Sequence, residues 1–182
     1  MLYIVVALKA EAQAFVDKYK LKKTKLKEFT LYENETIKII QSGVGVENAT
    51  QATQTLLNFY DMSDEDIFLN VGVCASDKKY NIGELVEVSS VLYEEKLYTL
   101  NNRDKESIKC LDTPSSDKAN KLVDMESFGF YEPLYYATAV KHKYIFKVVS
   151  DHFQPQKLTK EGVKSLLFNQ IDAINRIIFP KD

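Results

Sequence analysis

Residues 2–8 form a continuous apolar run, and this run constrains the fold more than any other stretch of the chain. It is rich in β-branched side chains and contains no charged residue, which is typical of a strand that is buried on both faces of a sheet. Residues 67–73 predict a second buried strand, and residues 144–149 predict a further strand. Strands buried in this way need other elements packed on both faces of their sheet.

Apolar stripes at helical spacing predict three helices, at residues 10–19, 48–60 and 160–179. Thr159 is expected to cap the last of these. A central helix is expected after residue 124 and should run to about His142. Pro133 should kink this helix, because proline removes one backbone hydrogen bond and clashes with the preceding turn.

Shorter strands are predicted at residues 29–32, 36–41, 83–91, 96–100 and 107–111. Residues 21–27 are rich in lysine and lack interleaved aromatic side chains, so we expect a solvated connection there rather than a binding patch. No internal repeat or linker divides the chain. Because 182 residues suffice for one full core, we expect a single domain over residues 1–182.

Charge and composition exclude several classes of function. The net charge of −2 gives no electrostatic footprint for nucleic acid, and only Arg103 and Arg176 could grip a phosphate with a guanidinium group. No stretch approaches the roughly 20 apolar residues of a membrane span, and the apolar start lacks the basic lead of a signal peptide. Cys74 and Cys110 are too few for a disulfide framework. We therefore expect a cytoplasmic protein that binds neither nucleic acid nor a membrane.

Two acids follow predicted strands directly. Glu11 lies in the loop or first helical turn after residues 2–8, and Asp151 lies at the carboxyl end of residues 144–149. In an open α/β sheet, ligands bind outside the carboxyl ends of the strands. Both acids could therefore face a ligand, although Glu11 could equally be a solvated acid that a helix N-terminus favours.

Residues 121–131 place two carboxylates and a thioether at the start of the central helix. Asp124 can act as an N-cap, and Glu126 then falls in the first turn, where the helix dipole favours its charged form. A capped and buried helix explains this pattern without any function. The alternative is that Glu126 faces a ligand that carries hydroxyl groups.

A turn with two glycines, Ser42-Gly43-Val44-Gly45, follows the strand at residues 36–41. Glycines allow a tight turn and a close approach of the backbone to a ligand. The third glycine of a dinucleotide-binding fingerprint is missing, so a plain connection between a strand and a helix explains the turn equally well.

Five segments occur in one order along the chain, at residues 5–11, 42–49, 70–72 with 82–86, 123–126 and 148–151. In that order they resemble segments of the nucleoside phosphorylase/nucleosidase superfamily, and most closely of methylthioadenosine/S-adenosylhomocysteine nucleosidase-like proteins. The resemblance implies a three-layer α/β/α fold around a mixed, twisted, barrel-like sheet. It also implies cleavage of the N-glycosidic bond of a purine nucleoside, without a cofactor or a metal ion.

The resemblance also implies a role for each matched residue. Glu11 corresponds to the acid that activates water, and Asp151 corresponds to the acid that protonates N7 of the leaving base. Met125 and Glu126 correspond to the ribose-binding pair. The remaining substrate-binding positions that it implies are Ser42 and Gly43 on the sugar and water side, Gly72, and Ser150 beside the base acid.

The chemistry requires these residue types independently. Breaking a glycosidic bond builds positive charge on the sugar and negative charge on the base, so an acid must protonate the base and a carboxylate must take a proton from water. The absence of arginine near Glu11, Ser42 and Gly72 favours water over phosphate as the nucleophile.

Residues 91–121 are short for this family and offer no recognisable aromatic partner for a base, and His152 has no assigned role. Two alternatives therefore stay open, phosphorolysis of a purine nucleoside and a catalytically degenerate nucleoside-binding protein. The family also suggests a homo-oligomer, most simply a dimer. The aromatic-rich residues 128–136 could form its interface, or they could be ordinary core.

Overall fold

The computed structural model describes residues 1–115, 120–154, 156 and 158–180. Ten strands form its sheet: β1 (Leu2–Val6), β2 (Lys22–Leu26), β3 (Phe29–Glu33), β4 (Ile37–Gln41), β5 (Ile67–Ser76), β6 (Leu85–Tyr93), β7 (Lys96–Thr99), β8 (Glu106–Cys110), β9 (Leu122–Asp124) and β10 (His142–Asp151). The helices are α1 (Lys9–Tyr19), α2 (Val46–Phe59), α3 (Ser127–Tyr136), α4 (Lys160–Phe168) and α5 (Ile171–Ile178).

The sheet is open on one side and closed on the other. β1 pairs in parallel with β4 and β5, and the antiparallel strands β3 and β2 continue the sheet beyond β4. On the other side, β5 pairs with both β10 and β9, and β6 and β8 complete a ring between those two strands. Parallel and antiparallel pairs thus mix in one twisted sheet, half of which is a barrel.

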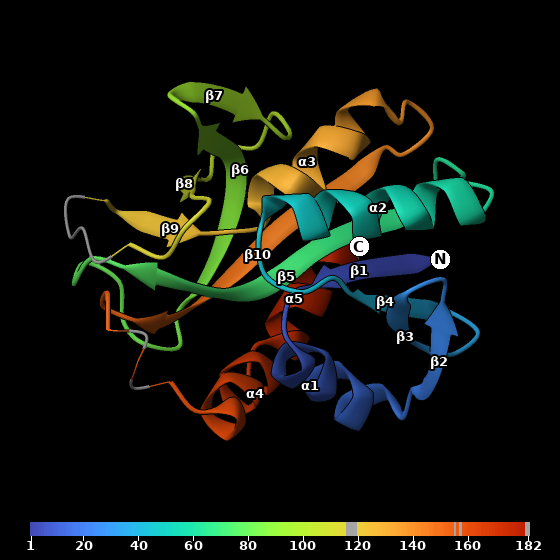
Figure 1. Cartoon of the computed structure of the whole chain (residues 1–182), viewed down its shortest axis with the longest axis horizontal. Helices are drawn as coiled ribbons and strands as arrows, with labels where there is room; N and C mark the ends of the chain where they lie inside the picture. Colours follow the sequence, from blue (N-terminus) through green and yellow to red (C-terminus); the bar gives the residue numbers. More distant parts are fainter. Residues whose placement is uncertain (116–119, 155, 157, 181–182) are drawn as a thin grey trace.

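Helices cover both faces of this sheet. Helices α2 and α3 lie on one face, and α1, α4 and α5 lie on the other (Figure 1). Two apolar clusters fill the spaces between these layers, one around Phe130, Val88 and Leu56, the other around Phe15, Ile4 and Leu167. The prediction of a three-layer α/β/α fold with a mixed sheet is confirmed.

Gly129 fixes how α3 approaches α2. A Cβ atom at this position would lie 2.1 Å from the carbonyl oxygen of Val46 and 2.9 Å from Cβ of Ala49. The two helices can therefore touch only because this residue has no side chain. Their contact brings the beginning of α3, and with it Glu126, against the turn that precedes α2.

Three predictions about secondary structure were wrong, one about the type of an element and two about where helices end. The lysine-rich residues 21–27 contain β2 rather than a connection, because their backbone pairs with β3 and the lysines lie along an exposed sheet edge. The central helix ends at Tyr136, and β10 already begins at His142. The helix predicted at residues 160–179 is divided into α4 and α5. The cap by Thr159 is confirmed, since its Oγ1 accepts from the Gly162 N–H at 3.0 Å.

None of the helices in the described part of the chain has the length and apolar character needed to cross a membrane.

Candidate active site

The carboxyl ends of β1, β5 and β10 meet the beginning of α3 at a cavity of about 240 Å³. Five of the residues to which the resemblance gave a role in catalysis or substrate binding line it: Glu11, Met125, Glu126, Ser150 and Asp151. Each comes from the junction of a strand with a loop or helix, which is where open α/β sheets bind ligands. The fold thus brings together three acids that are far apart in the sequence.

Glu11 is fixed by backbone N–H groups and is only 3% exposed. Its Oε2 accepts from the N–H groups of Ala7 and Leu8, each at 2.9 Å, and its Oε1 accepts from the Val73 N–H at 3.0 Å. Burial raises the pKa of Glu11, although these hydrogen bonds and the charge of Lys147 oppose the rise. A buried carboxylate with a raised pKa is suited to accept a proton near neutral pH.

Gly72 makes room for this arrangement. A Cβ atom at Gly72 would lie 2.8 Å from Oε1 of Glu11. Gly72 itself does not line the cavity; it lies behind Glu11 and allows its carboxylate to reach the Val73 N–H.

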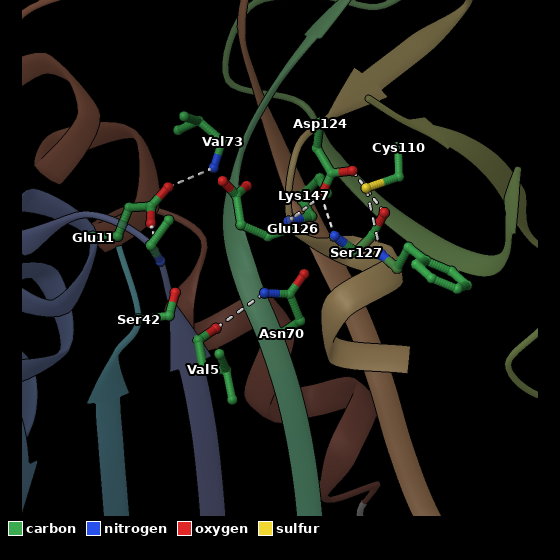
Figure 2. A network of polar contacts seen from close by, with 12 residues as sticks. Val5, Glu11, Ser42, Asn70, Val73, Cys110, Asp124, Glu126, Ser127 and Lys147 are labelled. Atoms are coloured by element: carbon green, nitrogen blue, oxygen red, sulfur yellow. Dashed lines mark hydrogen bonds and ion pairs between the residues drawn. The ribbon is translucent and has the colours of Figure 1, made fainter. Parts of the chain in front are cut away.

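Glu126 occupies the N-cap position of α3, but its side chain does not cap that helix. Its Oε1 instead accepts from the N–H of Gly45 at 2.9 Å, across the contact between α3 and the turn before α2. Burial raises the pKa of Glu126 to about 7, against the lowering effect of Lys147. Figure 2 shows its carboxylate between Glu11 and the Asp124–Lys147 pair.

Asp124 performs the capping that the sequence suggested, although it is the last residue of β9. One of its oxygens accepts from the Ser127 N–H at 2.9 Å, and the other accepts from the Ser127 hydroxyl at 2.6 Å. The same carboxylate forms an ion pair with Lys147, whose Nζ lies 2.7 Å from Oδ2. Asp124 therefore ties together β9, α3 and β10.

Lys147 is the functional candidate that the sequence reasoning missed. It lies within the apolar run of β10, is 1% exposed, and pairs with Asp124 (Figure 2). Asp124 in turn lines the cavity. Burial alone would lower the pKa of Lys147, but the charges of Asp124, Glu126 and Glu11 outweigh burial and raise it. The sequence contained an indication of this role, because a lysine inside a buried strand needs a buried acid as its partner.

Asp151 ends β10 and is held through both oxygens. Its Oδ1 accepts from the Gln154 N–H at 2.7 Å, and its Oδ2 lies 2.9 Å from Oγ of Ser150. Oγ of Ser150 also lies 3.1 Å from the carbonyl oxygen of Cys74. The hydroxyl has one hydrogen, so it can donate to Cys74 and accept from a protonated Asp151 without any change of geometry.

Ser42 and Gly43 lie near the site but do not line the cavity. The Ser42 hydroxyl lies 2.7 Å from the Gly43 carbonyl oxygen and 3.1 Å from the Val6 carbonyl oxygen, so its hydrogen bonding stabilises the turn itself. Val44, the next residue, is the part of this turn that reaches the cavity. His152 points elsewhere, with Nδ1 3.2 Å from the carbonyl oxygen of Ser76.

The far side of the cavity is apolar. Among described residues the rest of the lining includes the apolar residues Val73, Cys74, Ala75, Leu111 and Pro114 and the hydroxyl residues Thr113 and Ser115, with no aromatic ring. The nearby aromatic residues stack in the core instead: the rings of Tyr93 and Phe128 are 4.1 Å apart. Residues 116–119, which belong to the short segment noted in the sequence, lie outside the described residues.

No group of three or more histidine, cysteine or acidic side chains within the described ranges is arranged to hold a metal ion. Glu11 and Glu126 accept hydrogen bonds from backbone N–H groups, and Asp124 pairs with Lys147.

Comparison with known proteins identifies the fold. No family model matches the sequence, and no curated protein matches it. Among solved structures, 5′-methylthioadenosine nucleosidase of Arabidopsis thaliana aligns with a TM-score of 0.79 at 19% identity, over 100% of this chain and 96% of that chain. Futalosine hydrolase of Helicobacter pylori strain 26695 aligns with a TM-score of 0.71 at 13% identity, over 94% and 97%.

A third similar structure is the 5′-methylthioadenosine/S-adenosylhomocysteine nucleosidase of Neisseria meningitidis in complex with methylthio-immucillin-A. It has a TM-score of 0.73 and 14% identity, over 92% of this chain and 96% of that chain. The predicted likeness in fold to methylthioadenosine/S-adenosylhomocysteine nucleosidases is thereby confirmed.

Proposed function

We propose that this chain, which shares its fold with 5′-methylthioadenosine nucleosidases, hydrolyses the N-glycosidic bond of a purine nucleoside. The products would be the free base and a ribose derivative. One observation carries the proposal: Glu11, Glu126 and Asp151 line a single cavity at the carboxyl ends of the parallel strands. The reaction needs a base for water, an acid for the leaving group and a negative charge near the cationic sugar, and these three carboxyl groups can supply them.

Glu11 is the proposed general base. Three backbone N–H groups hold its carboxylate in one orientation, so water can be activated without rearrangement of the side chain. Its raised pKa brings it closer to the pH at which a carboxylate both stays ionised and accepts a proton well.

Glu126 is the proposed ligand for the sugar hydroxyls. Its Oε1 is held by the Gly45 N–H, which leaves Oε2 to accept from a substrate hydroxyl. The negative charge would also stabilise the positive charge that develops on the sugar ring. Met125 lines the same cavity, next to Glu126 in the chain, and would contact the sugar through its thioether side chain.

Asp151 is the proposed acid for the leaving base. Ser150 can accept a hydrogen bond from its protonated carboxyl group while donating to Cys74, so the acid form fits the site. Asp151 is only 7% exposed, which keeps the proton away from bulk water.

Phosphorolysis is less well supported, because neither arginine lines the cavity. Arg103 forms an ion pair with Glu87, and Arg176 lies on α5. A degenerate nucleoside-binding protein is the second candidate, favoured by the lack of an aromatic ring among the described residues of the apolar side. Turnover that requires phosphate would select phosphorolysis. Thermal stabilisation by nucleosides without release of base would select the degenerate nucleoside-binding protein.

The experiment is a measurement of free base after incubation with adenosine, methylthioadenosine and adenosylhomocysteine, in buffer without phosphate. We expect base release, and we expect Asp151→Asn to slow it about 10²–10⁴-fold. An equally fast Asp151→Asn variant would contradict the role given to this residue. Absence of release from every nucleoside would contradict the proposed activity.

We also propose that the protein acts in the cytoplasm as a homodimer. Cys74 and Cys110 are both free and buried, which suits a reducing compartment. Tyr135 and Tyr136 at the end of α3 are 62% and 76% exposed, and Leu97 of β7 is exposed beside them, so this apolar surface could contact a second copy. Sedimentation of wild type and of Tyr136→Glu tests the dimer, which the variant should dissociate.

A further inference from the structure

Lys147 and Glu11 come from different elements, but their side chains lie on the same face of the sheet. The pairing of β10 with β5 places Lys147 opposite Gly72. Residues opposite each other on neighbouring strands project their side chains from the same face. A Cβ atom at Gly72 would lie 2.8 Å from Oε1 of Glu11, so the carboxylate occupies that face too. The glycine thus leaves a lysine and a glutamate on one face of β5, beside a position that has no side chain.

Lys147 is the only buried lysine or arginine among the described residues. Its ammonium forms an ion pair with Asp124, and the carboxylate of Glu126 lies between this pair and Glu11 (Figure 2). Three buried carboxyl groups thus share one positive charge, and each of them favours the charged form of Lys147. Because charges interact over longer distances in a low-dielectric interior, the ammonium also acts on the two acids with which it forms no ion pair.

The other titratable groups that face this cluster add no positive charge. They are Cys74 of β5, Cys110 of β8 and Asp151 of β10. Burial raises the pKa of both thiols, so they stay neutral. Asp151 is neutral in the form proposed for the acid that protonates the leaving base. Lys147 is therefore the one buried cation that can act on Glu11 within the described part of the chain.

The charge of Lys147 opposes the effect of burial on Glu11. Burial raises the pKa of Glu11, because a low-dielectric interior disfavours its charged form. The backbone N–H groups of Ala7, Leu8 and Val73 lower this pKa, and the charge of the ammonium lowers it as well. A protonated Glu11 cannot take a proton from water, so the proposed base depends on the groups that keep it ionised.

We propose that Lys147 is a positioning residue of the reaction, whose ammonium holds Glu11 in the ionised form that can take a proton from water. This inference rests on the nucleosidase function proposed above and adds a residue that acts through the general base. Asp124 keeps the ammonium in place by an ion pair of 2.7 Å, and its hydrogen bond from the Ser127 N–H ties that pair to α3. A purely structural ion pair would join β9 and β10 in the same way but would leave the ionisation of Glu11 unchanged.

The test removes the ion pair without leaving a buried charge behind. In Lys147→Met/Asp124→Asn both side chains are neutral, and the asparagine oxygen can still accept from the Ser127 N–H. The acid limb of kcat/KM against pH reports the groups that must be ionised in the free enzyme. We expect this limb to move by about one unit to higher pH, so that kcat/KM falls about tenfold more on the acid side of the limb than above it.

Two single variants separate charge from packing. Lys147→Arg keeps the positive charge and should keep the acid limb at its wild-type pH. Asp124→Asn alone removes the acid that offsets the ammonium, so it should move the limb to lower pH. The double variant and Asp124→Asn break the same ion pair, and loss of packing alone would not shift the limb in opposite directions.

Lys38→Met/Glu33→Gln is the matched control. Lys38 of β4 and Glu33 of β3 form a cross-strand ion pair, also of 2.7 Å, and neither residue lines the cavity. The control should keep the acid limb at its wild-type pH. A thermal melt of each variant verifies that it is folded.

A second measurement follows Glu11 without any turnover. Carbon-13 NMR of the glutamate carboxyl carbons records their titration, and the Glu11 signal is assigned by its loss in Glu11→Gln. The assignment separates Glu11 from Glu126, which the acid limb alone does not. We expect the titration midpoint of Glu11 to rise by about one pH unit in the double variant and to stay unchanged in the control.

The outcomes separate this inference from the proposed function. An unmoved limb and an unmoved Glu11 midpoint in the folded double variant overturn the inference and leave the nucleosidase function standing. A moved limb with an unmoved Glu11 midpoint overturns the inference in favour of an effect on Glu126. If the double variant does not fold, Asp124→Asn decides, and a Glu11 midpoint that does not fall overturns the inference. A raised Glu11 midpoint in a protein that cleaves no nucleoside supports the charge effect and removes the proposed function.

Discussion

The two sides of the first cavity are built in different ways. On the acidic side, Glu11, Glu126 and Asp124 are held by backbone N–H groups and by one buried lysine, Lys147. On the apolar side, residues such as Leu111 offer only van der Waals contact. Polar groups buried this deeply must keep their partners, whereas apolar contacts can be exchanged at small cost. From this difference we expect the acidic side to fix the proposed reaction and the apolar side to fix substrate preference.

The largest effect is expected from Lys147→Met, which removes the cation on which the acidic side depends. Asp124 would be left buried without its ion-pair partner, so the free energy of unfolding should fall by about 3–5 kcal/mol. Denaturant unfolding measures this loss. The double variant Lys147→Met/Asp124→Leu should lose less free energy of unfolding than the two single variants lose in sum. Lys105→Met is the exposed control, and a wild-type unfolding midpoint for Lys147→Met would contradict the comparison.

Glu11→Gln should abolish most of the activity. The glutamine amide cannot act as the base, and its NH2 group cannot accept from the backbone N–H groups that now bond the carboxylate. We expect kcat to fall about 10²–10⁴-fold. Glu47→Gln, an exposed acid in the first turn of α2, is the matched control and should retain wild-type kcat. If both variants were equally active, the acidic side would not be the reactive side.

The pKa of Glu126 predicts a pH dependence of stability. Because burial raises this pKa to about 7 from the usual 4.5, the folded state binds a proton that the unfolded state has released between these two values. Stability from this group is therefore fully present below pH 4.5 and is lost as pH rises to about 7. The loss should be on the order of 1–3 kcal/mol.

Unfolding by denaturant at pH 4.5 to 7.5 measures this dependence, and Glu126→Gln should flatten it relative to wild type. The difference between the two curves isolates Glu126 from other carboxyl groups, such as Glu33, whose pKa is lowered by its hydrogen bond to Lys38. Parallel curves would show that Glu126 does not titrate in this range.

The smallest effect is expected on the apolar side. Leu111→Ala removes part of a half-buried contact worth about 1 kcal/mol, so KM should rise about fivefold while kcat changes little. Steady-state kinetics with the preferred nucleoside measure both constants. Phe59→Ala, at an exposed position at the end of α2 that does not line the cavity, is the control. A loss of kcat comparable to that of Glu11→Gln would remove the distinction between the two sides.

Much of the fold and part of the site could be predicted from the sequence, because the signals are local. Apolar runs and helical stripes marked β1, β5, β10, α1 and α2, and the positions of β1 and β10 placed Glu11 and Asp151 at strand ends. The capping role of Asp124 for α3 was also predictable, because a carboxylate two or three residues before a helix finds free N–H groups.

Tertiary structure decided what depends on partners far away in the chain. Residues 22–26 form a strand because their backbone pairs with β3. The lysine-rich sequence itself gives no sign of this pairing. Lys147 of β10 meets Asp124 of β9 because both strands belong to the ring that closes on β5. Glu126 meets the Gly45 N–H because Gly129 lets α3 touch α2. Local sequence thus determined which residues are strands, helices and acids. Close packing between distant segments decided which acid pairs with Lys147 and in which direction each acidic side chain points.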